Sequence, residues 1–444
     1  MIPCTPSPMY AYDFKLGSHV YDPAGQYLPR FFPFPMNHAG LDNVMQSQPT
    51  SPVSTSRSLA GREESPSFLV SPKEGVTPIT TPVASVAEEP RVRDVLGMIK
   101  QQVQPHGGFD IPKSLVHVPM RLILEDSVDL AKDQVGSRFL QSLIDSDQFT
   151  QADRDELSRR VLPEAKSLTL DPFGNYVVQK VVDGSNRAQR QVLFRQLKGD
   201  VFTLSIHTYG CRVIQKLIEQ SDLGEQIAVA RELDGHVVRC VEDQNGNHVI
   251  QKLIEKLPSV ELSFLVNEFL GHIPVMAVHC YGCRVVQRLL EKLSPSESSK
   301  LVAEILSHLW ALSQDQYGNY VVQHVLVHGT PQNRSIITQV IASHIVEFSC
   351  HKYASNVAEK ALLCHEDQYS RDLIIAAVIG SGGPDSPLHA LMKDRFANYV
   401  IQRCIEFSHG VQRDILISIL RANLPSLKRV IYGKHIANAI EKII

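Results

Sequence analysis

The chain has 444 residues, of which 43% are hydrophobic and 20% charged, and its formal net charge is -3. This composition fits a soluble protein with a sizeable core and excludes fibrous proteins. No stretch is apolar for the roughly eighteen residues that a membrane helix needs, and the amino terminus lacks the basic and apolar segments of a secretory signal. Eight scattered cysteines do not make a disulfide scaffold. We therefore expect a cytoplasmic protein that is not membrane-bound.

Residues 1–115 differ in composition from the rest of the chain. They hold 16 of the 26 prolines and are rich in Ser, Thr and Gln. Such a segment buries too little apolar surface to offset the entropy lost on ordering. We predict a disordered Pro/Ser/Thr-rich N-terminal tail over 1–115 and a folded domain over 116–444.

A six-residue motif recurs from residue 136 onward. Its strongest copies are Gly-Asn-Tyr-Val-Val-Gln at 174–179 and 318–323, Gly-Cys-Arg-Val-Ile-Gln at 210–215, Gly-Asn-His-Val-Ile-Gln at 246–251 and Gly-Cys-Arg-Val-Val-Gln at 282–287. Weaker copies lie at 136–141, 354–359 and 397–402. The central copies are 36 residues apart, and the last interval, of 43 residues, contains a loop-like insertion at 380–387.

A 36-residue period with helical patterning predicts a stack of repeats, because a single unit cannot bury its own apolar face. The length allows three helices in each unit, the second of which starts at the Gly or Ala of the motif. The fold class that we predict is therefore all-α: an α-solenoid of eight three-helix repeats. The aliphatic pairs of the motif, such as Val177 and Val178, are predicted core.

Positions in the motif are counted here from the residue after the Gly or Ala. At about 100° per residue, the first, second and fifth positions share one polar wedge of the helix. A merely solvated face would vary freely, yet the first and fifth positions take only three kinds of combination: Asn with Gln, a small Ser or Cys with Gln, and Ser with Glu. The trios are, in chain order, Ser137, Arg138, Gln141; Asn175, Tyr176, Gln179; Cys211, Arg212, Gln215; Asn247, His248, Gln251; Cys283, Arg284, Gln287; Asn319, Tyr320, Gln323; Ser355, Asn356, Glu359; Asn398, Tyr399, Gln402.

These trios suit the recognition of planar bases. The first and fifth residues are neighbours on a helix and can address one base edge together, while the second residue can stack on the base face. Asn with Gln suits the acceptor–donor–acceptor edge of uracil, and the Glu359 carboxylate suits the two adjacent donors of guanine. Gln beside a small Ser or Cys leaves room for the larger adenine. We therefore predict that each repeat binds one RNA base.

The motifs Asn-Tyr-Val-Val-Gln, Cys-Arg-Val-Val-Gln and Ser-Asn-Val-Ala-Glu, together with Tyr-Gly-Lys-His-Ile at 432–436, resemble those of the Pumilio (PUF) family of RNA-binding proteins over residues 116–444. The one-base-per-repeat code of that family is a known case of RNA recognition. The resemblance implies that the all-α solenoid is a right-handed superhelix of eight Pumilio repeats with terminal caps. It also implies antiparallel reading, with the eighth repeat at the RNA 5′ end. The predicted target is UGUAUAUA, with the fifth base the most tolerant (UGUANAUA).

The resemblance also implies a post-transcriptional regulator. Such a protein binds single-stranded mRNA in 3′ untranslated regions and promotes translational repression or mRNA decay. Deadenylase or translational repressor proteins are then expected on the convex face. We expect no enzyme activity, no cofactor, no metal and no small-molecule substrate.

Other interpretations explain less of the sequence. An armadillo-like scaffold for extended peptides also uses three-helix units, but it would not alternate these trios. Cys280 and Cys283 form one CxxC without a second pair, so a structural role is favoured over zinc binding. The aspartates three places ahead of the motif Gly or Ala are predicted helix caps: Asp133, Asp171, Asp243, Asp315, Asp394. At the same position, His207 and His279 are predicted packing or capping residues rather than general bases.

Overall fold

Each repeat folds into a short first helix, a longer motif helix and a third helix, as the spacing predicts. The computed structural model describes residues 96–97, 99–100, 118–364, 368–383 and 385–443, and these contain helices and no strand. The predicted tail at 1–115 lies outside the described residues, except for residues 96–97 and 99–100. All of the helices below belong to the unit Val86–Ile444.

The motif helices begin at the predicted Gly or Ala in seven repeats and two residues earlier in the first. They are α4 (Gln134–Ile144), α7 (Gly174–Asp183), α10 (Gly210–Gln220), α13 (Gly246–Lys256), α16 (Gly282–Lys292), α19 (Gly318–His328), α22 (Ala354–Cys364) and α25 (Ala397–Phe407). Each motif helix packs directly on the next, so they form one continuous row.

The first and third helices complete the repeats. The first helices are α3 (Ser127–Lys132), α6 (Ala165–Leu170), α9 (Val201–Ser205), α12 (Val237–Glu242), α15 (Ile273–Ala277), α18 (Leu309–Gln314), α21 (Ile345–Cys350) and α24 (Pro387–Leu391). The third helices are α5 (Gln151–Val161), α8 (Arg187–Leu197), α11 (Leu223–Arg231), α14 (Ser263–Phe269), α17 (Pro295–Ser307), α20 (Pro331–Ser343), α23 (Gln368–Ile379) and α26 (Gly410–Ala422). Short 3-10 segments, η3 (Leu162–Glu164) and η4 (Ser259–Leu262), precede α6 and α14.

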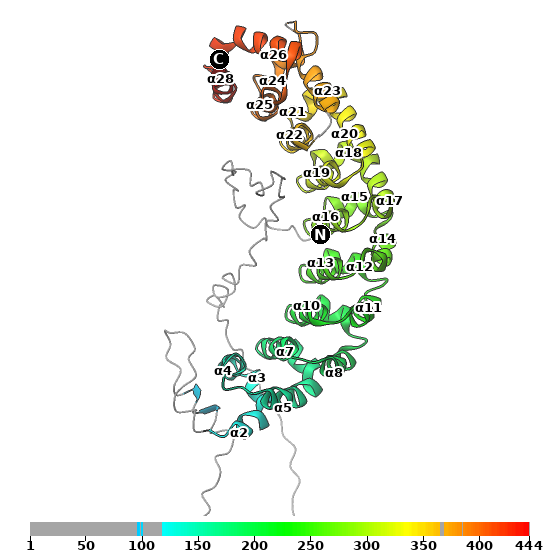
Figure 1. Cartoon of the computed structure of the whole chain (residues 1–444), viewed down its shortest axis with the longest axis vertical. Helices are drawn as coiled ribbons and strands as arrows, with labels where there is room; N and C mark the ends of the chain where they lie inside the picture. Colours follow the sequence, from blue (N-terminus) through cyan, green and yellow to red (C-terminus); the bar gives the residue numbers. More distant parts are fainter. Residues whose placement is uncertain (1–95, 98, 101–117, 365–367, 384, 444) are drawn as a thin grey trace, which may run out of the picture. The chain divides into compact units, whose positions relative to one another are not determined.

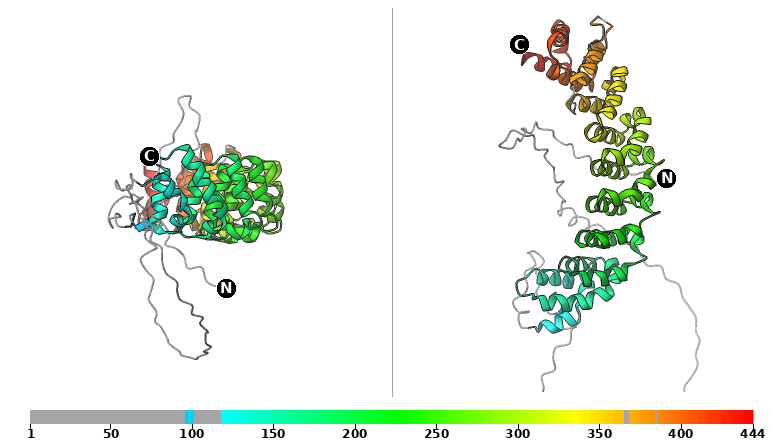
Figure 2. Two further views of the ribbon diagram at one scale, coloured as in Figure 1. Left: turned by 90° about the horizontal axis from the view of Figure 1, so that it is seen from below. Right: turned by 45° about the vertical axis from the view of Figure 1, so that its right-hand side comes forward.

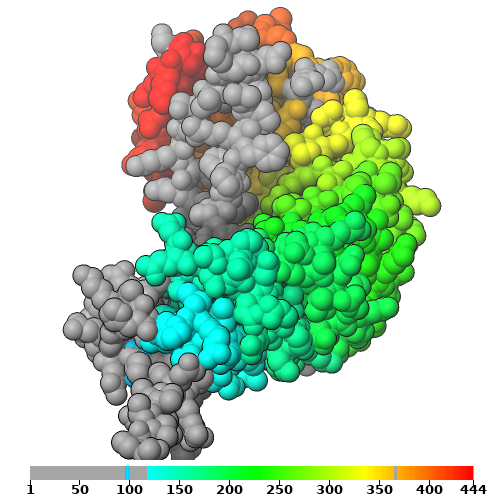
Figure 3. Space-filling view, turned by 60° about the horizontal axis from the view of Figure 1, so that its bottom comes forward, coloured from blue at the N-terminus to red at the C-terminus, as the bar shows by residue number. Residues whose placement is uncertain are grey.

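The row of repeats in this unit is curved. In Figure 1 the motif helices line the inner, concave side and the third helices line the outer, convex side. Figure 2 shows the same order of helices from two further directions, and in Figure 3 successive repeats meet in a continuous surface from cyan through green to yellow. The ends of the row are capped by α2 (Met120–Glu125) and by α27 (Leu424–Leu427) and α28 (Gly433–Glu441).

Glycine starts most motif helices because the backbone of the first helix is very close. A Cβ placed on Gly210 would lie 2.6 Å from the carbonyl oxygen of Leu204, and one on Gly246 would lie 2.6 Å from that of Cys240. These distances are shorter than a carbon and an oxygen tolerate without a shift of the backbone. The motif glycine therefore permits the tight turn between the first helix and the motif helix.

One apolar core runs through the stack. The predicted core pairs are fully buried, including Val177 and Val178, Val213 and Ile214, and Val285 and Val286, all at 0% exposure. Hydrogen bonds also join neighbouring repeats: the Glu232 carboxylate accepts hydrogen bonds from the backbone N–H groups of Gly199, at 2.7 Å, and Val201.

Among the described residues, none of the helices is long and apolar enough to span a bilayer.

Candidate nucleic-acid interface

The three predicted positions of the motif have three different environments, and these repeat in all eight motif helices. First-position side chains are buried, second-position side chains are exposed, and fifth-position side chains are half-buried except for Gln287, which is buried. A regular alternation of this kind places one ordered polar group and one exposed flat group per repeat on the concave side. The face is therefore a periodic surface with a spacing of one repeat.

First-position side chains are anchored to the backbone. In every repeat the side chain donates a hydrogen bond to the carbonyl oxygen three residues earlier, for example Asn319 Nδ2 to Gln316 at 3.0 Å and Cys211 Sγ to Thr208 at 3.5 Å. The same bond is made in the six other repeats, by Ser137, Asn175, Asn247, Cys283, Ser355 and Asn398. We expected both the first and the fifth residue to reach a base edge, but in this structure the first residue lies beneath the surface.

The Asn repeats use this anchored residue to orient the fifth one. Asn175 Nδ2 donates to the carbonyl oxygens of Asp171, at 2.9 Å, and Pro172, at 3.1 Å, so Asn175 Oδ1 must face outward as an acceptor. Gln179 Nε2 donates to that oxygen at 3.0 Å. Equivalent Gln-to-Asn bonds of 2.9, 2.9 and 3.0 Å join Gln251 to Asn247, Gln323 to Asn319 and Gln402 to Asn398. Gln251 and Gln323 thus present Oε1 and one remaining N–H. Nε2 of Gln179 and of Gln402 also donates to a backbone oxygen, that of Asn175 at 3.3 Å and that of Asn398 at 3.2 Å.

The Cys and Ser repeats lack this side-chain partner. Gln215 Nε2 donates instead to the backbone oxygen of Cys211 at 3.0 Å, and Gln141 does the same to Ser137 at 3.2 Å. Gln287 is 5% exposed, and its Nε2 has no hydrogen-bond partner among the described residues. A buried donor without a partner costs about 1–3 kcal/mol, so this group is suited to an acceptor on a ligand.

The seventh repeat has the one carboxylate of the series. Glu359 Oε1 accepts a hydrogen bond of 3.0 Å from Arg403 Nε of the next repeat, and Arg403 also pairs with Glu406. Each carboxylate oxygen has two lone pairs, so Glu359 can still accept two further N–H groups. Arg403 therefore orients Glu359, a role that the motif trios alone did not reveal.

Second-position side chains are open to a ligand. Tyr176, Tyr320 and Tyr399 are 43%, 46% and 57% exposed. The guanidinium of Arg284 lies 5.9 Å from the centre of the Tyr320 ring in the next repeat. Flat groups of successive repeats thus follow one another along the face, as base stacking requires.

The predicted capping residues do cap the motif helices. Asp315 Oδ1 accepts hydrogen bonds of 2.8 Å from the N–H groups of both Tyr317 and Gly318. His207 Nδ1 accepts from Tyr209 and Gly210 at 3.2 Å, and His279 and His351 act in the same way. The prediction that His207 and His279 are packing or capping residues rather than general bases is consistent with this geometry. Cys283 is buried, and burial raises the pKa of its thiol to about 11.

A basic column at the sixth position also borders the face. Six of its seven residues pair with acidic side chains of the same or the preceding repeat, as Lys216 Nζ does with Asp183 Oδ1 at 2.9 Å. The residues of the column are Lys180, Lys216, Lys252, Arg288, His324, Lys360 and Arg403. The sequence carries this signal, since six of the seven are Lys or Arg at the same position of the motif.

The Pumilio-family RNA binding repeat matches eight segments of the chain, at residues 127–154, 166–198, 200–233, 236–270, 272–306, 308–342, 344–375 and 388–420. Each segment contains one motif helix with its buried, exposed and half-buried positions. Together they cover more than half of the chain. The chain is a Pumilio-repeat solenoid and belongs to the Pumilio family, as the sequence predicted.

Similar proteins agree with this assignment. Pumilio homolog 1 of Arabidopsis thaliana is 43% identical over 66 residues, and the maternal protein pumilio of Drosophila melanogaster is 41% identical over 58 residues. These stretches cover 15% and 13% of this chain but only 7% and 4% of the relatives. The structure of PUF-8 in complex with PBE-RNA matches with a TM-score of 0.72 at 34% identity, covering 79% of this chain and 99% of that one. The Puf3 RNA-binding domain, bound to site B of the Cox17 RNA 3′ UTR recognition sequence, matches with a TM-score of 0.65 at 35% identity, covering 74% and 98%.

Proposed function

We propose that this protein binds single-stranded mRNA sequence-specifically, one base per repeat, at UGUAUAUA-like (UGUANAUA) elements. The observation that carries the proposal is the register of the eight motif helices: in each, a flat side chain is exposed next to a buried or half-buried polar group at the fifth position. PUF-8 bound to PBE-RNA and Puf3 bound to Cox17 RNA have the same fold and support RNA as the ligand.

The repeats would read bases through the fifth position, with the first position deciding which base fits. In the Asn repeats, Gln Oε1 is an acceptor that complements uracil N3–H, and Gln251 and Gln323 also keep an N–H for a neighbouring carbonyl oxygen. In the fifth repeat, the unpartnered Gln287 Nε2 would donate a hydrogen bond to adenine N1, and the small Cys283 leaves room for the purine. In the seventh repeat, Glu359 accepts from guanine N1–H and N2–H.

The regulatory part of the proposal concerns the convex side. Bound in a 3′ untranslated region in the cytoplasm, the protein would lower translation or mRNA stability by recruiting deadenylase or translational repressor proteins to the third helices. Tethering the chain to a reporter mRNA through an unrelated RNA-binding module tests this step separately from base recognition. A fall in reporter protein supports regulation, and an unchanged reporter would restrict the function to RNA binding.

Selection from a random RNA pool tests the RNA proposal most broadly. We expect enrichment of UGUANAUA, with the strongest constraint at the second base, because a mismatch there leaves the Glu359 charge poorly paired. The alternative, an armadillo-like scaffold for extended peptides, predicts a pool without any enriched motif. Equal affinity for UGUAUAUA and a scrambled octamer would also reject the proposal.

A further inference from the structure

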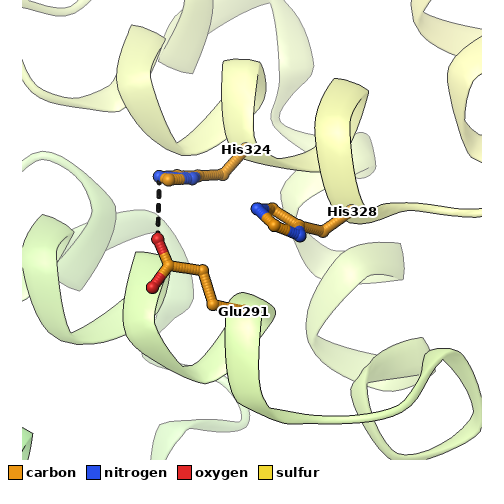
Figure 4. Close-up of side chains that lie close together, drawn as sticks. All are labelled: Glu291, His324 and His328. Atoms are coloured by element: carbon orange, nitrogen blue, oxygen red, sulfur yellow. Dashed lines mark ion pairs between the residues drawn. The ribbon is translucent and has the colours of Figure 1, made fainter. Parts of the chain in front are cut away.

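Three potential metal ligands meet between the fifth and sixth repeats. Glu291 lies on α16, and His324 and His328 lie on α19 (Figure 4). One ligand atom from each of the three residues lies within 4.8 Å of the other two. His324 Nε2 is 3.5 Å from Glu291 Oε1, and the two imidazole rings are stacked with their centres 5.5 Å apart.

The sixth repeat departs here from the pattern of the other repeats. His324 occupies the sixth motif position, which is Lys or Arg in repeats 2–5, 7 and 8, and His328 has no histidine counterpart in any other motif helix. The two histidines are four residues apart, so both imidazoles lie on one face of α19. Neither histidine belongs to the trio proposed to bind a base. We expected no metal from the sequence, where only one CxxC pair is present. Glu291 is distant from the two histidines in the chain, and their proximity follows only from the stacking of repeats.

We propose that Glu291, His324 and His328 form a binding site for a divalent transition-metal ion, with Zn²⁺ as the best match, that bridges repeats five and six. Two imidazole nitrogens and a carboxylate oxygen are a donor set that Zn²⁺ uses in proteins, with the fourth position left to water or another ligand. Bond lengths of about 2.0–2.2 Å require these atoms to come closer together than in this structure. Glu291 and His328 are exposed, so rotation of their side chains can supply that movement.

The charges around the cluster act in both directions. Burial lowers the pKa of His324 to about 3, with further lowering by His328, Lys360, Arg284 and Arg288, and burial also lowers the pKa of His328. Neutral imidazole is the form that binds a metal. The positive charges of Lys360, Arg284 and Arg288 disfavour the binding of a divalent cation. Arg288 Nη1 also pairs with Glu291 Oε2 at 2.9 Å. Glu291 Oε1 remains directed toward His324, so we expect a site weaker than a closed four-ligand zinc site.

Metal binding by the tag-free full chain tests the proposal, with Zn²⁺ followed by calorimetry and Co²⁺ by its visible absorption. His324→Lys is a suitable variant because lysine stands at this position in repeats 2, 3, 4 and 7. His328→Gln provides a second, independent ligand loss, and His435→Gln is a matched control at an exposed histidine of α28. Circular dichroism confirms that each variant keeps its helices.

We expect one high-affinity ion per chain for the wild type and for His435→Gln. Loss of either ligand should weaken this binding by more than about tenfold, since even outer-shell changes cost that much. Equal metal affinity in all four proteins would mean adventitious binding at other histidines and would overturn the proposal. No binding to the wild type would overturn it as well.

Discussion

Gln323 Nε2 donates a hydrogen bond of 2.9 Å to Asn319 Oδ1, and Asn319 itself is completely buried. The first-position asparagine therefore acts from beneath the surface. Its own NH₂ group is held by two backbone oxygens, so its Oδ1 fixes which way the glutamine amide points. The proposed difference between uracil and adenine repeats lies in whether this buried residue supplies a side-chain acceptor for the glutamine.

Asn319→Cys tests that role with a residue that the chain already uses at the same buried position in repeats 3 and 5. Without Asn319 Oδ1, Gln323 should behave like Gln287, and the preference for the third base should move from U toward A. Fluorescence anisotropy with UGUAUAUA and UGAAUAUA measures the ratio of affinities, which we expect to change by about 1–3 kcal/mol. The reciprocal variant Cys283→Asn should favour U at the fourth base. Unchanged preferences in both variants would remove the first position from base selection.

Arg403 is expected to sharpen guanine recognition by holding Glu359. Arg403→Met should reduce the discrimination between UGUAUAUA and UAUAUAUA by about 0.2–1 kcal/mol, the range for a partly exposed ion pair. The control is Lys216→Met, which removes a sixth-position cation that pairs with Asp183 and Glu219 and not with the fifth-position Gln215. The control should weaken all RNAs alike. A loss of guanine preference in the control as well would show only a general charge effect.

The caps of the motif helices should contribute to stability. Asp315→Ala removes the acceptor of two backbone N–H groups and should lower the free energy of unfolding by about 0.5–2 kcal/mol, measured in urea. Asp315→His should retain much of the stability, because His207, His279 and His351 cap the equivalent helices. If the alanine and histidine variants are equally unstable, the capping bond is not what stabilises this turn.

The buried thiols should be inert in the folded protein. Burial raises the pKa of Cys283 to about 11 and that of Cys404 to about 12, so almost no thiolate is present at neutral pH. Iodoacetamide at pH 7.5, followed by peptide mass spectrometry, should label these cysteines far more slowly in the native protein than in urea. Equal labelling rates in the two states would contradict the packing of the motif helices.

The repeating features of this protein were predictable from its sequence, and the contacts between repeats were not. The 36-residue spacing predicted the three-helix units, the aliphatic core and the caps at Asp315 and His207. It did not predict that Asn319 lies beneath Gln323, because helical periodicity places both on the same polar wedge. Arg403 and the cluster at Glu291 depend on the side chains of adjacent repeats, which a single motif cannot show.

Exchange of one repeat's base-reading pair for another's tests the central claim most directly. In the double variant Asn175→Ser with Gln179→Glu, Tyr176 remains as the stacking group, and Lys216 occupies the position that Arg403 has beside Glu359. The new carboxylate would gain two guanine N–H donors and would meet acceptor oxygens on uracil.

The measurement is the affinity of this double variant for UGUAUAUA and UGUAUAGA, with an unchanged helical circular-dichroism signal as the test of folding. The wild type should prefer U at the seventh base, and the variant should prefer G, with a discrimination of about 1–3 kcal/mol reversed in sign. A folded variant that still prefers U there would show that residues 175 and 179 do not select the base, and the one-base-per-repeat account would be contradicted.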